Sequence, residues 1–353
     1  MSSEKFSTCL ICWYRKNKRD LPWRKTRDPY KIWISEIMLQ QTTVSAVIPY
    51  YERWIKKFPS IKSVSRASLQ KVLKVWQGLG YYSRARNIHK CAKNLMQFHG
   101  GKIPQGYEPL RKLPGFGPYT TGAVLSIAFD KRFSIVDANV RRVVMRLLAL
   151  KGQADTTKDK KVEVFLEDVM PQKAMSDFNQ GLMELGALVC RSKEPACNMC
   201  PVKNFCKAYA QNIQEIIPTP KKIEIKNISV AVAIIEKNKK FLIQRRPLKG
   251  LLAGLWEFPG GKLKKAESSK KALVREVKEE LGMDAIDLRP FMKTKHFYTQ
   301  YRVLLDVWKC GLKKYPKQND DRKWVSLANL KKYPMPSGDA KILEKLIELK
   351  GIK

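Results

Sequence analysis

No segment of the 353-residue sequence is both long enough and apolar enough to cross a membrane or to act as a secretory signal peptide. Residues 1–19, MSSEKFSTCLICWYRKNKR, carry charges throughout and contain no long apolar run. These absences argue against a membrane protein and against a secreted one. We expect a soluble protein of the cytoplasm with no membrane partner.

Acidic residues are scarce. The chain has 32 aspartates and glutamates against 69 lysines and arginines, which gives a formal net charge of +37. Basic residues exceed acidic ones on both sides of Pro220. Because such a chain repels itself unless a polyanion neutralises it, the imbalance favours nucleic acid as the partner. A generally lysine-rich composition is the alternative, and motifs have to decide between the two.

Internal repeats and low-complexity tracts are also absent. The domain boundaries therefore have to be inferred from changes in the spacing of apolar residues along the chain. Between about residues 28 and 208 apolar residues recur at intervals of three and four, which predicts one helix after another. The segment IIPTPKKIEIK combines two prolines with a charge run and predicts a linker. Beyond it, ISVAVAIIEKNKKFLIQRR predicts two strands and SSKKALVREVKEELG predicts a helix. The predicted fold is multi-domain: an all-α domain over 1–215, a linker over 216–226 and an α/β domain over 227–353.

Half of the eight cysteines are gathered in one short loop. These are Cys190, Cys197, Cys200 and Cys206, whereas Cys9, Cys12, Cys91 and Cys310 are dispersed. Because disulfides are rare in the cytoplasm, clustered cysteines there more often bind metals. Four thiolates in a compact loop can hold a [4Fe–4S] cluster or a tetrahedral zinc ion, and spacing alone does not separate the two.

A glycine-containing turn, Leu-Pro-Gly-Phe-Gly over residues 113–117, precedes a helix predicted to begin around Pro118. Gly115 and Gly117 permit a tight turn whose backbone N–H groups can face a phosphate at a helix N-terminus. A structural helix cap would have the same sequence, so the turn needs context. That context follows about twenty residues later in IVDANVRR, residues 135–142.

The glycine turn, the aspartate segment and the six-two-five cysteine spacing together resemble the helix-hairpin-helix DNA glycosylases of the endonuclease III and MutY type. The resemblance implies that the four cysteines hold a [4Fe–4S] cluster beside a DNA-facing surface. It also implies that Gly115 and Gly117 contact the DNA backbone, and that Asp137 faces the sugar of an extruded nucleotide. Members that cleave the strand carry a nucleophilic lysine after the hairpin. This chain has Tyr119 there, so base removal without strand cleavage is expected.

The segment ISEIMLQQT, residues 34–42, closely resembles the MutY signature. Glu36 lies there among apolar residues that would raise its pKa and keep a proton available near neutral pH, although a solvated helix glutamate is the alternative for this segment alone. The resemblance implies that Glu36 protonates N7 of adenine and later helps to activate water. It implies that Asp137 stabilises the developing oxocarbenium ion, with Tyr119 and Asn139 in support.

A base must leave the duplex to reach such a site, which requires a wedge and a receiving pocket. The resemblance assigns the wedge to Gln41, Thr42, Leu79 and Tyr81. It assigns the adenine pocket to Arg19, Leu21, Trp23, Arg24 and Gln180. Leu21 and Leu79 could equally be core residues, because both are apolar.

The second domain contains the full pattern of a Nudix box. Its members are Gly261, Glu267, Arg275, Glu276, Glu279, Glu280 and Gly282. In pyrophosphohydrolases such glutamates gather Mg²⁺ on one helix. In MutY proteins a related domain recognises 8-oxoguanine, and its Phe-Ser-His turn aligns here with Tyr298, Thr299 and Gln300. Gln300 cannot become cationic as histidine can, so weaker lesion selectivity is expected.

We interpret the chain as a MutY-type adenine DNA glycosylase with a Nudix-like domain. It is expected to act as a monomer on double-stranded DNA with adenine opposite 8-oxoguanine or guanine, and so to associate with the bacterial nucleoid. One alternative is a mismatch glycosylase of different specificity. The others are a Nudix nucleotide hydrolase with a DNA-binding domain and a lesion-binding module without catalysis.

Overall fold

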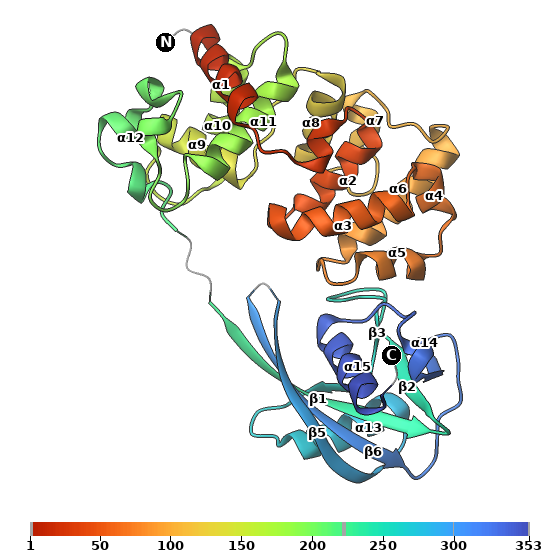
Figure 1. Ribbon diagram of the computed structural model, residues 1–353. Helices are drawn as coiled ribbons and strands as arrows, with labels where there is room; N and C mark the ends of the chain where they lie inside the picture. The colour runs from red at the N-terminus through yellow and green to blue at the C-terminus, as the bar shows by residue number, and fades with distance from the viewer. Residues whose placement is uncertain (1–2, 221–223, 299, 352–353) are drawn as a thin grey trace. The chain divides into compact units, whose positions relative to one another are not determined.

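The computed structural model of the chain describes residues 3–220, 224–298 and 300–351 (Figure 1). The chain folds into two compact units: Met1–Arg66 with Asn87–Lys222, and Ala67–Arg86 with Ile223–Lys353. The domain boundaries expected at residues 215 and 227 stay predictions.

The first part of the chain is helical, as the periodicity predicts, and the helices begin earlier than expected because α1 precedes residue 28. The longer helices are α1 (Ser3–Asn17), α2 (Pro29–Leu39), α3 (Val44–Lys57), α6 (Ser83–Phe98), α8 (Pro118–Phe129), α9 (Ala138–Leu147), α10 (Thr156–Val169) and α11 (Met175–Leu188). The shorter ones are α4 (Ile61–Arg66), α5 (Leu69–Trp76), α7 (Tyr107–Arg111) and α12 (Lys207–Ala210), with 3-10 turns at Pro22–Lys25, Cys197–Met199, Lys203–Phe205 and Gln214–Ile216.

Capping residues fix where the helices near the candidate site begin. The Asp28 side chain accepts a hydrogen bond from Tyr30 N at the start of α2, and Pro29 occupies the first turn. At the start of α9, Asp137 Oδ1 accepts a 2.7 Å hydrogen bond from Val140 N. Asp137 is therefore held at a helix N-terminus, where the positive end of the helix dipole stabilises a carboxylate.

Two apolar clusters position the elements of the first unit. One packs α1, α9, α10 and α11 together through buried residues such as Phe6, Val144, Leu166 and Leu182. The other joins α2 to α8 through Ile32, Ala123, Ile127 and Ile135. Because this second cluster holds α2 against α8, polar side chains from both helices can meet at the same place.

The second unit is built on a sheet in the order β3-β2-β1-β6-β5, with β4 paired to β1 and β7 paired to β2. The strands are β1 (Lys226–Lys237), β2 (Lys240–Arg245), β3 (Trp256–Glu257), β4 (Gly260–Lys262), β5 (Ala285–Tyr298), β6 (Tyr301–Leu312) and β7 (Arg322–Ser326). The helices beyond residue 223 are α13 (Ser269–Leu281), α14 (Leu327–Leu330) and α15 (Ser337–Leu349). Strands β1 and β6 run parallel, with Val232 beside Val307.

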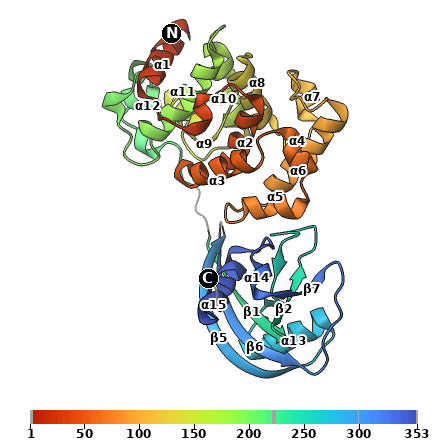
Figure 2. The same ribbon diagram turned by 45° about the vertical axis from the view of Figure 1, so that its right-hand side comes forward.

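Alternation along β1 separates two cores, one on each face of the sheet. Ala231, Ala233 and Ile235 pack with α13, whereas Val232 and Ile234 pack with α15. The two helices accordingly lie on opposite faces (Figures 1 and 2). The predicted strand pair and the predicted helix α13 are both confirmed.

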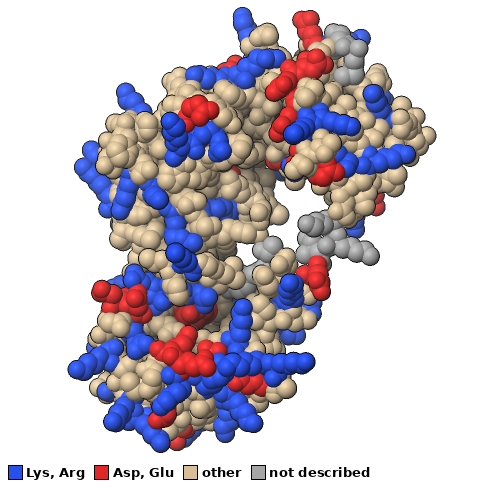
Figure 3. All heavy atoms as spheres, turned by 180° about the vertical axis from the view of Figure 1, so that it is seen from behind, with Lys and Arg blue, Asp and Glu red and all other residues tan. Residues whose placement is uncertain are grey.

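Basic side chains are spread widely over the surface drawn in Figure 3, and acidic ones form smaller groups among them. Within the described ranges, no helix has both the length and the apolar character needed to span a bilayer.

Candidate functional site

A cavity of about 930 Å³ opens in the first unit. This volume lies within the range of small-molecule sites, which is about 300–1,000 Å³. The residues that line it include most of those predicted from the sequence: Arg19, Leu21, Trp23, Arg24, Glu36, Gln41, Thr42, Tyr119, Asp137, Asn139 and Gln180. Segments far apart in the sequence therefore meet at one place.

Glu36 is a buried carboxyl on α2, with 4% of its surface exposed. The Tyr119 hydroxyl, from the first turn of α8, donates a 2.7 Å hydrogen bond to Glu36 Oε2. Burial raises the pKa of Glu36 to about 7; the charge of Asp137 acts in the same direction, and the Tyr119 hydrogen bond and the Arg24 charge oppose it. Glu36 is thus not a solvated helix glutamate, and it can hold a proton at neutral pH.

Asp137 also lines the cavity, and two hydrogen bonds orient its carboxylate. Its Oδ1 caps α9, and its Oδ2 accepts a 3.1 Å hydrogen bond from Asn139 Nδ2. Arg142 in turn donates 2.9 Å hydrogen bonds to Asn139 Oδ1 and to the Cys190 carbonyl. A Cβ at Gly186 would lie 2.6 Å from Asn139 Cβ, so glycine is needed for this close approach.

Glu184 is a cavity residue that the sequence motifs do not reveal. It is fully buried on α11 and accepts hydrogen bonds from Arg19 Nε at 2.8 Å and from Arg24 at 2.6 Å. Burial by itself would raise the pKa of Glu184, but its hydrogen bonds with Arg19 and Arg24 outweigh that effect and lower the pKa to about 2. Glu184 follows Gln180 by four residues and so lies on the same face of α11. This spacing from a predicted pocket residue was the one signal in the sequence that Glu184 also faces the pocket.

The other predicted pocket residues supply shape and further polarity. Leu21 and Trp23 are buried and also line the cavity, so each has a core role and a surface toward the site. Gln180 Nε2 donates to Ser176 Oγ at 3.0 Å. The lining also contains residues that were not singled out from the sequence, among them Gln40, Met183 and Ala187.

The predicted wedge residues differ in position. Gln41 and Thr42 lie at the cavity rim, and Gln41 is exposed with a left-handed backbone, φ 55°. Leu79 and Tyr81 belong to the segment that groups with the second unit. Leu79 is buried, whereas Tyr81 is 38% exposed.

The two hairpin glycines are not part of the cavity lining. Gly115 has φ 86°, which favours glycine, and it closes the turn before α8. Gly117 caps α8 with an extended backbone, and a Cβ added at this residue would have no neighbouring atom within 4 Å. A helix N-terminus favours an anion, and the open space beside Gly117 leaves room for another molecule to approach it.

The four clustered cysteines line one cavity together with apolar residues of α9 and α11. Arg146 is buried beside them, and it donates a 3.3 Å hydrogen bond to Cys190 Sγ. Its other acceptors are the carbonyls of Ile217, Arg191 and Ser192. Within the described part of the chain, no three ligand-type side chains are arranged to hold one metal ion.

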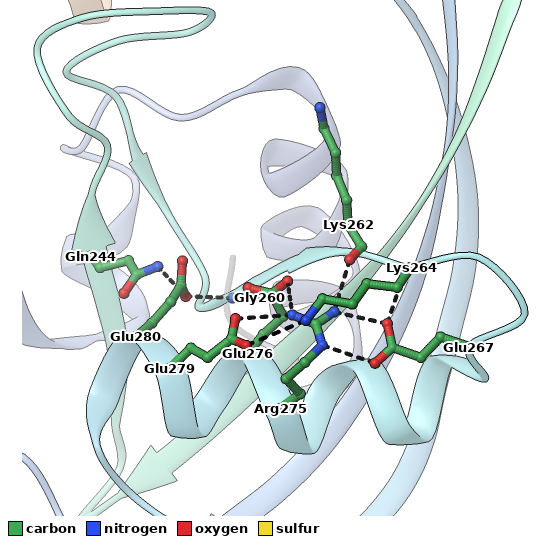
Figure 4. A network of polar contacts seen from close by, with 9 residues as sticks. All are labelled: Gln244, Gly260, Lys262, Lys264, Glu267, Arg275, Glu276, Glu279 and Glu280. Carbon is green, nitrogen blue, oxygen red and sulfur yellow. Dashed lines mark hydrogen bonds and ion pairs between the residues drawn. The ribbon is translucent and has the colours of Figure 1, made fainter.

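The Nudix-box side chains are engaged with one another (Figure 4). Arg275 donates to both oxygens of Glu267, to Glu276 at 2.7 Å and to Glu279 at 3.0 Å. Glu280 accepts from Gln244 at 2.6 Å and from Gly260 N at 3.1 Å. Arg275 therefore pairs with three glutamates of the box, whereas Glu280 is held by Gln244 and the backbone of Gly260.

Of the predicted lesion-reading residues, Tyr298 ends β5 and Gln300 directly precedes β6. Thr299 and the side chain of Tyr298 lie outside the described residues. Gln300 is half-buried, and its Nε2 donates to the Tyr301 hydroxyl at 3.4 Å. The backbone carbonyl of Gln300 accepts a 2.8 Å hydrogen bond from Lys226 N at the start of β1.

Comparisons with known proteins match the helical part of the chain and the part that contains the sheet to two different families. Residues 34–172 match the family model described as "HhH-GPD superfamily base excision DNA repair protein", and residues 230–345 match that of the NUDIX domain. The chain is 36% identical over 345 residues to the adenine DNA glycosylase of Buchnera aphidicola subsp. Schizaphis graminum, covering 96% of this chain and 98% of the relative. It is 33% identical to the human adenine DNA glycosylase, covering 87% of this chain and 67% of the relative.

Solved structures agree with the helical fold. A thermostable thymine-DNA glycosylase matches 59% of this chain and 97% of its own, with a TM-score of 0.54 and 29% sequence identity. An endonuclease III–DNA complex matches 61% of this chain and 99% of its own, with a TM-score of 0.51 and 24% identity.

Proposed function

The chain belongs to the adenine DNA glycosylase family, and from that premise we propose that it removes adenine opposite 8-oxoguanine, and opposite guanine, without cleaving the strand. It is an N-glycosyl hydrolase of base-excision repair. In our proposal it acts as a monomer on double-stranded DNA. The observation that carries the proposal is the buried Glu36 carboxyl beside Tyr119 and Asp137 in one cavity.

Glu36 serves as the general acid. Adenine leaves poorly as an anion, so a proton delivered to its N7 weakens the bond to the sugar. A carboxyl whose pKa is about 7 keeps its proton in a large fraction of molecules at neutral pH. Once deprotonated, the same group can accept a proton from the attacking water.

Asp137 stabilises the positive charge that develops on the sugar. Its carboxylate is fixed by the α9 N-terminus and by Asn139, so it is oriented before the substrate arrives. The division between an acid and a charge-stabilising carboxylate parallels that in glycoside hydrolysis. Tyr119 offers no amine for attack on the sugar, which supports base removal without strand cleavage.

The walls of the cavity form the adenine pocket. Arg19 and Arg24 are held in place by the buried Glu184, and Leu21 and Trp23 supply apolar surface for the base. Gln41 and Thr42 at the rim, with Leu79 and Tyr81, are proposed to enter the duplex and hold the base outside it. Gly115 and Gly117 are proposed to contact the DNA backbone.

The second unit is proposed to read the opposing base through Tyr298, Thr299 and Gln300. Gln300 can donate and accept hydrogen bonds but cannot carry a positive charge. We therefore expect the preference for adenine opposite 8-oxoguanine over adenine opposite guanine to be modest. The ratio of the two excision rates measures this selectivity.

A [4Fe–4S] cluster is proposed to be held by Cys190, Cys197, Cys200 and Cys206. The donor set fits, because all four thiols line one cavity, and four thiolates in a compact loop are the ligands of a [4Fe–4S] cluster or of a tetrahedral zinc ion. The six-two-five spacing of the cysteines, which resembles that of the iron–sulfur glycosylases, favours the cluster. The buried Arg146 guanidinium also fits an anionic group at this place. When bound, the cluster would fix the loop and its basic surface, and no acid or base is required of it.

Metal content tests this assignment without reference to activity. We expect about four iron atoms per chain, with broad visible absorption that is lost in Cys197→Ser. One zinc ion per chain and no iron would contradict the cluster.

The central experiment is a single-turnover assay of base release. Duplexes with adenine opposite 8-oxoguanine or guanine, thymine opposite guanine, and adenine opposite thymine are compared, each analysed with and without alkali. We expect release of adenine from the first two and strand breaks only after alkali. Glu36→Gln should lower the rate by about 10²–10⁴-fold, because it removes the acid.

The matched control is Glu163→Gln, an exposed glutamate on α10 that should leave the rate unchanged. Preferred release of thymine would support the mismatch-glycosylase alternative. Tight binding without base release would support the lesion-binding module, and unchanged activity in Glu36→Gln would remove the proposed acid.

A further inference from the structure

A short segment from the helical part of the sequence belongs to the second unit. Residues 67–86 lie in sequence between helices of the first unit, but they form one compact unit with residues 223–353. The segment contains α5, the start of α6 and the loop over residues 77–82 that joins these two helices, here named the wedge loop. It carries Leu79 and Tyr81, the two residues of the second unit that are proposed to enter the duplex.

The backbone of the wedge loop is held by side chains that flank it. Trp76 Nε1 donates a 2.9 Å hydrogen bond to the Gly80 carbonyl. The buried Arg84 guanidinium donates 3.2 Å hydrogen bonds to the carbonyls of Leu79 and Gly80. Tyr81 is 38% exposed and has a left-handed backbone, φ 48°, a conformation that persists only where its surroundings hold it. The wedge loop therefore presents an aromatic ring from a braced turn.

Gln77 ends α5 and begins the wedge loop, and its side chain connects the loop to the residues that precede α15. Its Oε1 accepts a 2.8 Å hydrogen bond from Lys74 Nζ and a 3.4 Å hydrogen bond from Met335 N. Lys74 Nζ also donates a 3.3 Å hydrogen bond to the Tyr333 carbonyl. Because Met335 is fully buried, one amide oxygen joins the wedge loop to the core of the second unit.

The chain segments that receive the wedge loop are fixed to the sheet. The Pro334 carbonyl accepts a 2.9 Å hydrogen bond from Trp256 N of β3. On the other side of the wedge loop, Arg86 Nη1 of α6 donates a 2.6 Å hydrogen bond to the carbonyl of Ala253, which is fully buried shortly before β3. Both ends of the wedge loop are thus fastened to segments that contact β3 or lead into it.

We propose that Gln77 and Arg86 are positioning residues that hold the wedge loop on the second unit, which also carries the proposed reader of the opposing base. This inference rests on the proposed glycosylase function. Neither residue is among the described residues that line the Glu36 cavity. Extrusion of a base costs unstacking energy, and the wedge loop supplies it only if the Tyr81 ring is held firmly. One body then reads the opposing base and helps to extrude the adenine.

The test measures base extrusion by the full chain without excision. All proteins carry Glu36→Gln, and the duplex carries 2-aminopurine, whose fluorescence rises when it leaves the stack, in place of adenine opposite 8-oxoguanine. Gln77→Ala removes the acceptor for Lys74 Nζ and Met335 N, so the extrusion equilibrium constant should fall by about tenfold. Arg86→Ala should lower it in the same direction. Affinity for a fully paired duplex, in which no base is extruded, should change by less than about twofold, because phosphate contacts dominate it.

Gln77→Glu is the conservative variant, because its carboxylate still accepts from Lys74 and Met335 N. Extrusion should return to within about threefold of the parent. Gln97→Ala, at an exposed position on α6, is the matched control and should leave extrusion unchanged. A double-variant comparison separates positioning from general stability. In a Tyr81→Ala background the ring that the wedge loop presents is gone, so Gln77→Ala should lower extrusion by less than about a further twofold.

Unchanged extrusion in either Gln77→Ala or Arg86→Ala would overturn the proposal. So would an equal effect of Gln77→Ala with and without the Tyr81 ring, or a loss of affinity for the fully paired duplex as large as the loss of extrusion. No fluorescence rise in the parent would remove the wedge, and this proposal with it. Adenine release by the wild type is measured separately, so failure of the glycosylase proposal and failure of this one give different results.

Discussion

At the residue scale, the behaviour of Glu36 depends on one hydroxyl. The Tyr119 hydrogen bond stabilises the ionised form of Glu36 and lowers its pKa, against the larger effect of burial. Activity that requires the protonated acid should therefore decline as pH rises through about 7 in the wild type.

Removing that hydroxyl should move the decline to higher pH. In Tyr119→Phe the ionised carboxylate loses a charge-assisted hydrogen bond of about 1.5–3 kcal/mol, which corresponds to a shift of about one to two pH units. The pH dependence of the single-turnover excision rate measures this shift. A profile that moved to lower pH, or did not move, would contradict the inferred balance at Glu36.

Glu184 should contribute strongly to stability. Glu184→Gln leaves the Arg19 and Arg24 guanidinium groups without their buried carboxylate, and the free energy of unfolding should fall by about 3 kcal/mol. Urea denaturation measures the loss. The exposed pair of Asp20 and Lys25 provides the control, since Asp20→Asn should change stability by less than about 1 kcal/mol.

The same carboxylate predicts a pH dependence of stability. The pKa of Glu184 is lowered in the folded state to about 2 from an ordinary value of 4.5. Its stabilisation is therefore fully present above pH 4.5 and is lost as pH falls toward 2. Glu184→Gln should accordingly lose less stability than the wild type across that acid range.

At the scale of elements, the start of α9 combines a structural task with a catalytic one. Asp137→Asn retains a side-chain oxygen that can cap the helix, so the free energy of unfolding should stay within about 0.5 kcal/mol. It removes the negative charge, so the excision rate should fall by about 10²-fold or more. Asp137→Ala should lose the same activity and, in addition, about 1 kcal/mol of stability. Thermal or urea unfolding alongside the excision assay separates the two effects; equal stability in both variants would mean that the cap is unimportant.

Helices and strands with a regular apolar pattern were predictable, and so were the residues of the Glu36 cavity that lie in recognisable motifs. The pattern in ISEIMLQQT indicates a buried helix, and the sites at Tyr119 and Asp137 follow glycine-containing or aspartate-containing turns. Glu184 was not predicted, because its partners Arg19 and Arg24 lie about 160 residues away and no local periodicity records such a pairing. Arg275 and its three glutamate partners are close in sequence, but their pairing was not predicted either. The same spacing of glutamates also suits a metal site, and the sequence does not distinguish the two.

At the scale of the whole molecule, the net charge of +37 should dominate the affinity for DNA. Binding that neutralises about six or more phosphates releases their counterions, so affinity should fall by about 10³-fold or more between roughly 50 and 200 mM salt. Fluorescence anisotropy with the inactive Glu36→Gln variant measures binding without turnover. A decrease below about tenfold would show that the basic surface contributes little to DNA binding.

The hydrogen-bonded Glu36 also has a consequence for the order of events during repair. In a large fraction of molecules at neutral pH its proton is on the protein before any substrate is present, because burial favours the neutral acid. In the protonated fraction of molecules, the lesion therefore meets an enzyme that already carries the proton that the leaving base needs. The attacking water returns a proton to Glu36 in the same turnover, so the acid is restored without a separate protonation step.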